Sequence, residues 1–244
     1  MLGQPHEGAY TGNDQAVSSA VLAKGGSIRR LRDRAVPPLE RCERCVLHLR
    51  LCLCASVKPI ELATRVVVLR HGKEAYKPTN TGRLVPLTLA QGEIRVFGAR
   101  DRELDTTGFF DPDRRVVLLY PSPDSVLLAR DESDPRPVTL IVPDSDWRRA
   151  YKLATREEKL AGVARVHLPE GPPSKYRLRF HPDPRYLATF EAVARALGIL
   201  EGAQVQAQLE HVFAMMVDRT LWSRGQIAGE RVTGGLPEAT SSPQ

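Results

Sequence analysis

Three features are absent from this sequence, and each absence excludes a class of protein. No apolar stretch approaches the roughly 20 residues of a membrane-spanning helix, so we expect no membrane association. The residues after Met1 do not form a basic region followed by an apolar core, so we expect no secretory signal. No cysteine occurs outside residues 42–54, so no distant disulfide can form. These absences predict a soluble, cytoplasmic protein.

The overall composition is that of a folded protein with a positive charge. The chain has 244 residues, of which 42% are hydrophobic, enough for one large domain or one domain with appendages. The formal net charge of +6 is compatible with a polyanionic partner such as a nucleic acid. Charge alone does not identify the partner, because many basic proteins bind no nucleic acid.

The chain divides into four predicted regions. Residues 1–36 form a flexible basic tail, with a possible short helix at 21–34. Residues 37–60 hold the cysteines, and residues 61–224 form the main domain. Residues 225–244 are rich in glycine, serine and proline, which predicts a disordered tail.

The cysteines lie in one short segment with the spacing C-x2-C-x6-C-x-C. They are Cys42, Cys45, Cys52 and Cys54. Thiolates suit Zn²⁺, and four protein ligands leave no open position for a substrate water, so we predict a structural zinc site. Two disulfides or redox-active thiols are the alternatives. His48, inside the segment, could replace one cysteine as a ligand or be a bystander on the intervening turn.

Short apolar runs alternate with helical patterns after the cysteine segment. Strands are predicted at residues 64–70, 116–120 and 138–142, with a basic strand-like piece at 176–180. Helices are predicted at residues 145–154, 187–197 and 203–221. Nearly continuous apolar strands that lead into helices predict an α/β fold with a mainly parallel sheet and helices on both faces.

In such folds ligands bind beyond the carboxyl ends of the strands. The loops that follow the predicted strands, at residues 70–84, 121–124 and 143–150, hold the unusual residues of the chain. A fourth candidate segment begins at Tyr186, at the start of a later helix. We therefore expect a binding site where these segments meet.

Several short motifs follow the cysteine segment in order. They are His71-x-x-Glu74, Thr79-Asn80-Thr81-Gly82-Arg83-Leu84, Tyr120-Pro121, Asp144-Ser145-Asp146-Trp147-Arg148, Tyr176-x-Leu178-Arg179 and Ala188-Thr189-x-Glu191-Ala192. This order resembles the DTW-domain family, the tRNA-uridine aminocarboxypropyltransferases, over about residues 39–200. One departure is visible: the family motif Asp-x-Thr-Trp has Asp146 where threonine is usual.

The resemblance implies both a fold and a reaction. The implied fold is related to the knotted SPOUT-type α/β enzymes that modify RNA. S-adenosylmethionine is the implied donor, and a uridine in tRNA is the implied acceptor. The reaction would transfer the 3-amino-3-carboxypropyl group to N3 of the uridine and release 5′-methylthioadenosine.

This reaction needs positioning and a base. The sulfonium already activates its attached carbons, so the pocket selects which carbon meets the nucleophile. The uridine N3–H is a weak acid, and a nearby carboxylate could remove its proton. Asp144, at the end of a buried strand, is the first candidate, and Asp146 and Glu191 are the alternatives. Asp144 could instead be an ordinary helix N-cap.

The resemblance also suggests residues that contact the cofactor: Tyr120, Pro121, Asp144, Trp147, Thr189 and Glu191. Trp147 could form a wall for adenine or for the target base, or it could pack in the core. Thr189 and Glu191 could hold ribose hydroxyls or the methionyl ammonium, or only stabilise a helix N-terminus. Pro121 could shape the cofactor loop or simply end a strand.

Basic residues in or beside the motifs are predicted to neutralise tRNA phosphates. They are Arg83, Arg148, Arg149, Lys152, Arg177 and Arg179. The tail arginines at positions 29, 30, 32 and 34 could add non-specific affinity or form a solvated charge cluster. The zinc segment could also present Arg41, Arg44 and Arg50 to RNA.

Two other functions remain open. A SPOUT-like RNA methyltransferase could hold the same cofactor in another pose, and the mass of the product would distinguish it. A zinc-containing RNA-binding protein without catalysis is the second, because Asp146 replaces the usual threonine. Binding of S-adenosylmethionine would separate that protein from an enzyme.

Overall fold

The computed structural model describes residues 40–98, 103–179, 183 and 186–237. The predicted basic tail at residues 1–36, with its helix at 21–34, lies outside the described residues, as does the end of the chain from 238. Within the described part, no helix has the length and apolar character needed to cross a bilayer.

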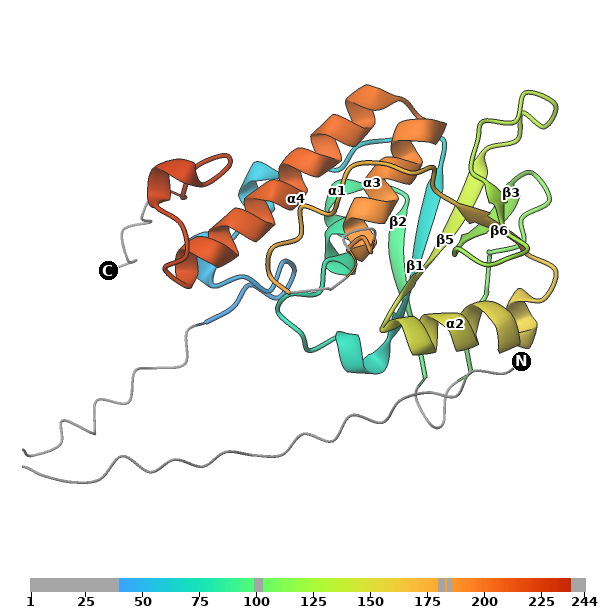
Figure 1. Cartoon of the computed structure of the whole chain (residues 1–244), viewed down its shortest axis with the longest axis horizontal. Coiled ribbons are helices and arrows are strands. Elements are labelled where there is room, and N and C mark those ends of the chain that lie inside the picture. Colours follow the sequence, from blue (N-terminus) through green and yellow to red (C-terminus); the bar gives the residue numbers. More distant parts are fainter. Residues whose placement is uncertain (1–39, 99–102, 180–182, 184–185, 238–244) are drawn as a thin grey trace, which may run out of the picture. The chain divides into compact units, whose positions relative to one another are not determined.

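Six parallel strands of the described chain form one sheet in the order β2-β1-β5-β3-β6-β4 (Figure 1). Their bounds are β1 (Arg65–His71), β2 (Gly92–Phe97), β3 (Arg115–Leu119), β4 (Val126–Leu127), β5 (Val138–Asp144) and β6 (Ala164–His167). The largely buried strands β1 and β5 are neighbours, and Arg70 pairs in register with Asp144. The predicted α/β fold with a parallel sheet is confirmed.

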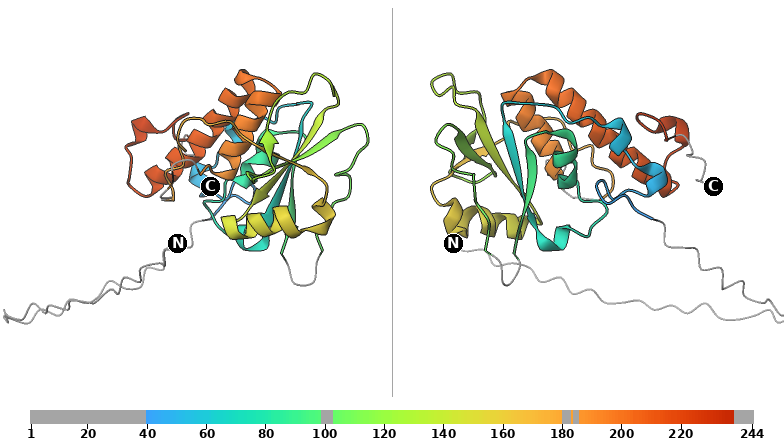
Figure 2. Two further views of the ribbon diagram at one scale, coloured as in Figure 1. Left: turned by 45° about the vertical axis from the view of Figure 1, so that its right-hand side comes forward. Right: turned by 180° about the vertical axis from the view of Figure 1, so that it is seen from behind.

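Helices cover both faces of the sheet (Figures 1 and 2). One face carries α1 (Val85–Thr88), α3 (Thr189–Leu200) and α4 (Ala203–Ser223), and the other carries α2 (Trp147–Arg156). Short 3₁₀ turns occupy Leu49–Leu51, Cys54–Ser56, Gly72–Glu74, Gly82–Leu84, Glu158–Leu160 and Gly229–Arg231. In β1, Val66 and Val68 pack in the core beneath α1, α3 and α4. Val67 and Leu69 pack in the core beneath α2. Packing on both sides explains why this strand is apolar at consecutive positions.

The three apolar strands and three helices expected from the sequence are confirmed within a few residues. The strands β2, β4 and β6 were not predicted. β2 lies at an edge of the sheet and carries Glu93 and Arg95, so its sequence lacks the apolar run of a central strand. The strand-like interpretation of residues 176–180 was wrong where the structure describes them, because Arg177 and Leu178 form a turn.

The end of the described chain differs from the predicted disordered tail. Val232 is buried, and Thr233 Oγ1 donates to Asp218 Oδ2 of α4 at 2.6 Å. Arg219 of the same helix donates from Nε to the carbonyl of Gly235 at 3.3 Å. Polar contacts from α4 therefore order this glycine-rich segment, which has little apolar pattern of its own.

Strands β1 and β5 define the place where a ligand site is expected. The connection from β1 to β2 passes through α1 on one face, and the connection from β5 to β6 passes through α2 on the other. Connections that leave neighbouring parallel strands toward opposite faces open a crevice at the carboxyl ends of those strands. Asp144 is the last residue of β5 and therefore lies at this crevice.

Candidate active site and cysteine site

The four cysteine sulfurs converge on one point. All four lie within 4.8 Å of one another, and the pairs Cys42–Cys54 and Cys45–Cys52 are each 3.7 Å apart. Zinc–sulfur bonds of about 2.3 Å in a tetrahedron give sulfur–sulfur distances of about 3.8 Å. None of the cysteines is in a disulfide, and His48 is not part of the converging group. The donor set therefore fits Zn²⁺.

A tight turn brings the first two cysteines together. The N–H of Val46 donates to the carbonyl of Cys42 at 2.8 Å, and Val46 adopts a φ of 60°, which is rare for a β-branched residue. Burial opposes ionisation of Cys42, but hydrogen bonds from the backbone N–H groups of Cys45 and Arg44 lower its pKa to about 6. At Cys42 this turn favours the thiolate, which is the form that binds metals, whereas burial raises the pKa of the Cys45 and Cys54 thiols.

A buried arginine connects the cysteine segment to α4. Arg219 is only 1% exposed, and its Nη1 donates to the carbonyls of Cys52 at 2.7 Å and Leu51 at 3.3 Å. Burial lowers the pKa of Arg219, and the negative charges of Cys52 and Cys45 oppose this change. A buried guanidinium needs hydrogen-bond acceptors, and the carbonyls of the cysteine segment supply them.

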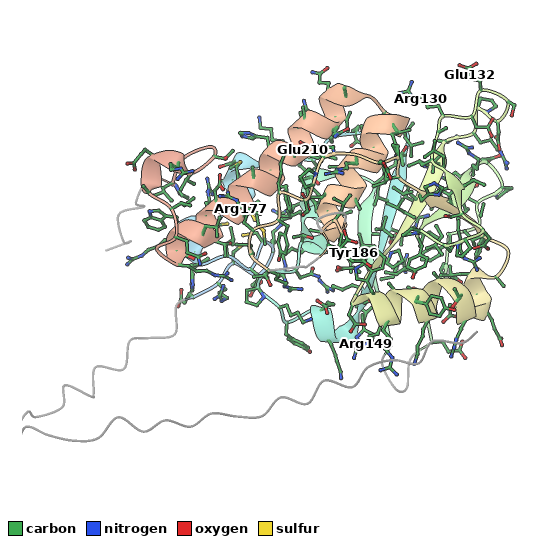
Figure 3. The ribbon with its side chains drawn as sticks, in the orientation of Figure 1. Arg130, Glu132, Arg149, Arg177, Tyr186 and Glu210 are labelled. Atoms are coloured by element: carbon green, nitrogen blue, oxygen red, sulfur yellow. The ribbon has the colours of Figure 1, made fainter. Side chains whose placement is uncertain are left out.

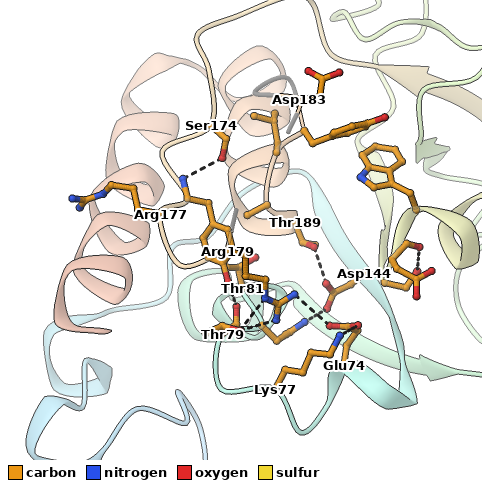
Figure 4. A pocket seen from close by; sticks show the side chains of 18 residues that line it. Glu74, Lys77, Thr79, Thr81, Asp144, Ser174, Arg177, Arg179, Asp183 and Thr189 are labelled. Carbon is orange, nitrogen blue, oxygen red and sulfur yellow. Dashed lines mark hydrogen bonds and ion pairs between the residues drawn. The ribbon is translucent and has the colours of Figure 1, made fainter. Parts of the chain in front are cut away.

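A cavity of about 670 Å³ opens at the carboxyl ends of β1 and β5 (Figure 4). Its lining comes from residues 74–81, 144–147, 174–179 and 183–189, as far as the structure describes them. The loops predicted after the first and third apolar strands, and the segment from Tyr186, therefore meet here. The loop at 121–124 is not among the lining segments.

Asp144 forms the floor of this cavity and is 4% exposed. Thr189, the first residue of α3, donates from Oγ1 to Asp144 Oδ1 at 2.7 Å, and Asn80 donates from Nδ2 to Asp144 Oδ2 at 2.7 Å (Figure 4). Burial raises the pKa of Asp144, and these two hydrogen bonds partly oppose the change. The structure thus holds a carboxylate that is fixed in position and more basic than usual.

The Thr79–Leu84 motif shapes the floor around Asp144. A Cβ at Gly82 would lie 2.6 Å from Asp144 Oδ2, so only glycine leaves room for the carboxylate. Thr81 Oγ1 accepts the N–H of Phe190 at 3.2 Å and thereby connects this loop to α3. The motif was recognised in the sequence, but no role was predicted for Asn80. The available signal was the amide side chain of Asn80, in a loop that comes earlier in the chain than Asp144 at its strand end.

An aromatic group borders the cavity beside Asp144. Trp147 is 40% exposed and lines the cavity, so the interpretation of Trp147 as a core residue was wrong. Its ring centroid lies 4.5 Å from that of Tyr186 and 6.1 Å from that of Tyr120. Tyr120 is buried and supports Trp147 from the end of β3, and Pro121, the next residue, is exposed. These rings form an apolar wall suited to a flat ligand.

Asp146 is the N-cap of α2, which corrects the interpretation of Asp144 as a helix cap. Asp146 Oδ1 accepts the N–H of Arg149 at 2.9 Å, and its carboxylate also pairs with the Arg149 side chain. Threonine and aspartate both cap helices in this way. The family threonine at position 146 therefore has a structural equivalent in this chain.

Glu191 is buried and holds the start of α3. Its carboxylate accepts three hydrogen bonds: from the hydroxyl of Ser174 at 2.5 Å, from the N–H of Lys175 at 2.6 Å and from the N–H of Ala188 at 3.0 Å. These contacts fix residues 174–175 against the helix, and Ser174 lines the cavity. The carboxylate of Glu191 itself is not among the groups that line the cavity.

The basic residues expected to bind RNA fall into four environments. Arg148 and Lys152 are exposed on α2, and Arg149 lies beside them. Arg179 lines the cavity, where its Nη2 donates to Thr79 Oγ1 at 2.7 Å. Arg177 pairs with Asp218 and points away from the cavity floor, toward α4 (Figures 3 and 4).

Arg83 is the remaining member of that set, and its side chain lies inside the protein. Arg83 is 4% exposed, and it donates to the carbonyls of Lys77 at 2.7 Å and Asn80 at 3.0 Å. Burial lowers its pKa. The guanidinium thus supports the loop that carries Asn80, and a phosphate could not reach it without unfolding that loop.

Comparisons with known proteins agree with the motif order. The protein named tRNA-uridine aminocarboxypropyltransferase 2 of Drosophila melanogaster is 28% identical over 176 residues, which are 68% of this chain and 70% of that relative. The protein of the same name in Macaca fascicularis is 29% identical over 199 residues, covering 76% of this chain and 66% of that relative. In Arabidopsis thaliana, tRNA-uridine aminocarboxypropyltransferase A is 29% identical over 210 residues, which cover 72% of this chain and 79% of that relative.

No solved structure matches this chain. The family model described as the DTW domain matches residues 39–221, a range that includes the cysteine segment, the whole parallel sheet and the cavity around Asp144. Because this match covers most of the sequence, the chain belongs to the DTW-domain family.

Proposed function

We propose that this protein transfers the 3-amino-3-carboxypropyl group of S-adenosylmethionine to N3 of a uridine in tRNA and releases 5′-methylthioadenosine. The names of its relatives in the DTW-domain family support the reaction type. The observation that carries the proposal within this chain is the buried Asp144 on the floor of the cavity at the ends of β1 and β5.

The cavity has the size and chemistry expected of a site for this donor. Its volume of about 670 Å³ is within the range of small-molecule sites. The rings of Trp147 and Tyr186 offer an apolar wall for adenine, and the hydroxyl of Thr189 lies at the floor. When bound, S-adenosylmethionine supplies a carbon already activated by the sulfonium, so the pocket chiefly has to orient it.

Asp144 is the proposed general base. Each carboxylate oxygen accepts one hydrogen bond from the protein and has a further lone pair, so it can still accept the N3 proton. Its raised pKa makes it a better base near neutral pH than an ordinary aspartate. Asn80 and Thr189 hold the carboxylate in place during the proton transfer.

The other parts of the proposal concern the rest of the chain. The cysteine site would hold a structural Zn²⁺, because four thiolate ligands leave no open position for catalysis. Arg148, Arg149, Lys152 and Arg179 would contact the tRNA around the cavity. The parallel sheet with a site at its carboxyl edge supports a relation to SPOUT-type enzymes. A cytoplasmic location would bring the enzyme to its tRNA.

Nucleoside mass spectrometry tests the proposal directly. Purified protein is incubated with unmodified tRNA and S-adenosylmethionine, and the tRNA is digested to nucleosides. The expected product is a uridine with the added mass of the aminocarboxypropyl group, together with released methylthioadenosine. A methyl group on the uridine would identify a methyltransferase instead, and the absence of any product across a broad tRNA pool would contradict the proposed activity.

A further inference from the structure

Two exposed tyrosines adjoin residues that line the cavity. Tyr76 is 89% exposed, and the next residue in its loop, Lys77, lines the cavity. Tyr151 is 51% exposed on α2, one helical turn after Trp147, which also lines the cavity. Each tyrosine therefore neighbours a cavity-lining residue, one in a loop and the other on α2, and both residues are exposed to solvent.

A stripe of positive charge runs beside one of these rings. Arg148, Lys152 and Arg156 recur every four residues on α2, so they lie about 6 Å apart along one line of the helix. All three are exposed, and α2 contains no acidic residue. Figure 3 shows Arg149 at the start of this helix. Aromatic rings next to a basic stripe are typical of surfaces that bind single-stranded nucleic acid.

We propose that unpaired nucleotides on either side of the target uridine stack on Tyr76 and Tyr151, while their phosphates follow Arg148, Lys152 and Arg156. This inference rests on the proposed function and adds the residues that hold the nucleotides on either side of the uridine. Neither tyrosine takes part in the chemistry.

The chemistry at N3 independently requires an unpaired base. N3 lies on the Watson–Crick edge of uridine and is occupied by the partner base in a duplex. The uridine must therefore leave any pair before Asp144 can reach its N3–H. Its neighbours then lose stacking partners, and exposed aromatic rings can replace them. A duplex could contact the basic stripe through its phosphates but would leave the two tyrosines without a base.

The test measures RNA binding by fluorescence anisotropy in the absence of S-adenosylmethionine. One probe is an RNA hairpin with uridine in its loop, and the other is a blunt duplex of the stem sequence. Tyr76→Ala and Tyr151→Ala should each weaken hairpin binding about 5- to 100-fold, the effect of losing one stacked base. Tyr76→Phe and Tyr151→Phe keep the ring and should bind within about 2-fold of the wild type.

Phe110→Ala is the matched control, because Phe110 is 53% exposed and lies in the segment that leads into the start of β3, whereas the cavity lies at the carboxyl ends of the strands. It should bind hairpin and duplex as the wild type does. The inference is overturned if the tyrosine-to-alanine variants weaken hairpin binding no more than Phe110→Ala does. It is also overturned if they weaken the binding of hairpin and duplex equally. If the wild type forms the nucleoside product while the alanine variants bind the hairpin normally, the stacking inference is wrong and the proposed function stands. A wild type that binds neither RNA contradicts the proposed function as well.

Discussion

The cysteine site and the cavity around Asp144 are built in opposite ways. The cysteine site takes all its ligands from residues 42–54, and its tight turn is made by neighbours in sequence. The cavity takes Asn80, Asp144 and Thr189 from three distant segments, which meet only because β1 and β5 are neighbours. A local site can be recognised from spacing, whereas an assembled site depends on the topology of the sheet.

The two sites also differ in what their polar groups are left to do. In the cysteine site the thiolates face one another, so a bound metal would be enclosed by the protein. At the cavity floor the carboxylate of Asp144 faces an open volume and keeps unused lone pairs. The first arrangement favours stability, and the second favours chemistry. Substitutions in each site should separate these effects.

The largest effect is expected from Cys45→Ser. Cys45 is fully buried, and structural zinc contributes up to about 10–16 kcal/mol of binding free energy in small peptides. The variant should lose its metal and unfold at a much lower temperature, as measured by metal analysis and thermal denaturation. His48→Ala is the control and should keep its zinc, because His48 is outside the converging group. Equal metal content in the Cys45 variant and the wild type would contradict the site.

Asp144→Asn should separate activity from stability. Losing the base should lower the rate of product formation about 10²- to 10⁴-fold. The pKa of Asp144 is raised in the folded protein, so its ionised form costs stability once the pH rises through that pKa. The variant should therefore unfold at a higher temperature than the wild type at pH 7, and this difference should vanish as the pH falls below about 4.

A matched variant, Thr189→Val, tests the same pKa from the other direction. It removes a hydrogen bond that lowers the pKa of Asp144, so the acid limb of the pH–rate profile should move to higher pH while activity persists at alkaline pH. If the profile of Thr189→Val coincides with that of the wild type, Asp144 is not the base.

Gly82→Ala should have an intermediate effect. The added Cβ would lie 2.6 Å from Asp144 Oδ2, so the carboxylate must shift, at a cost of about 1–3 kcal/mol in unfolding free energy. Activity should fall as the base is displaced. The control is Gly72→Ala in the same loop, where the nearest atoms would be 4.0 Å away, and it should be nearly neutral. Denaturant unfolding and product formation are the measurements, and equal effects at both glycines would contradict the packing argument.

The smallest effect is expected from Asp146→Thr, which introduces the residue usual in the family. Both side chains can accept the N–H of Arg149 at the start of α2, so unfolding free energy should change by less than about 0.5 kcal/mol. Product formation should stay within about 2-fold. A large change in activity with unchanged stability would show that position 146 acts in the reaction and not only as a cap.

Much of the fold could be predicted because its central strands are covered on both faces. Residues 138–142 and 116–120 are apolar at nearly every position, and a run of this length and composition is typical of a strand buried on both sides. The edge strand β2 was missed because its partly exposed residues include Glu93 and Arg95. Residues 176–179 alternate as a strand would, yet the described part forms a turn in which Tyr176 donates from its hydroxyl to the carbonyl of Thr79 at 2.5 Å.

The sequence by itself determined the cysteine cluster, the α/β class and the position of Asp144 at the end of a buried strand, because these depend on spacing or on apolar runs along the chain. Only the tertiary structure decided the roles of the other charged groups near the cavity. Asp146 caps α2, Glu191 holds α3, and Arg83 is buried under the loop. The hydrogen-bond partners of these three groups lie only 3 to 17 residues away in the sequence. The physical reason is that the packing of loop and helix decides which neighbour each group contacts and whether its side chain is buried, and no local pattern records that packing.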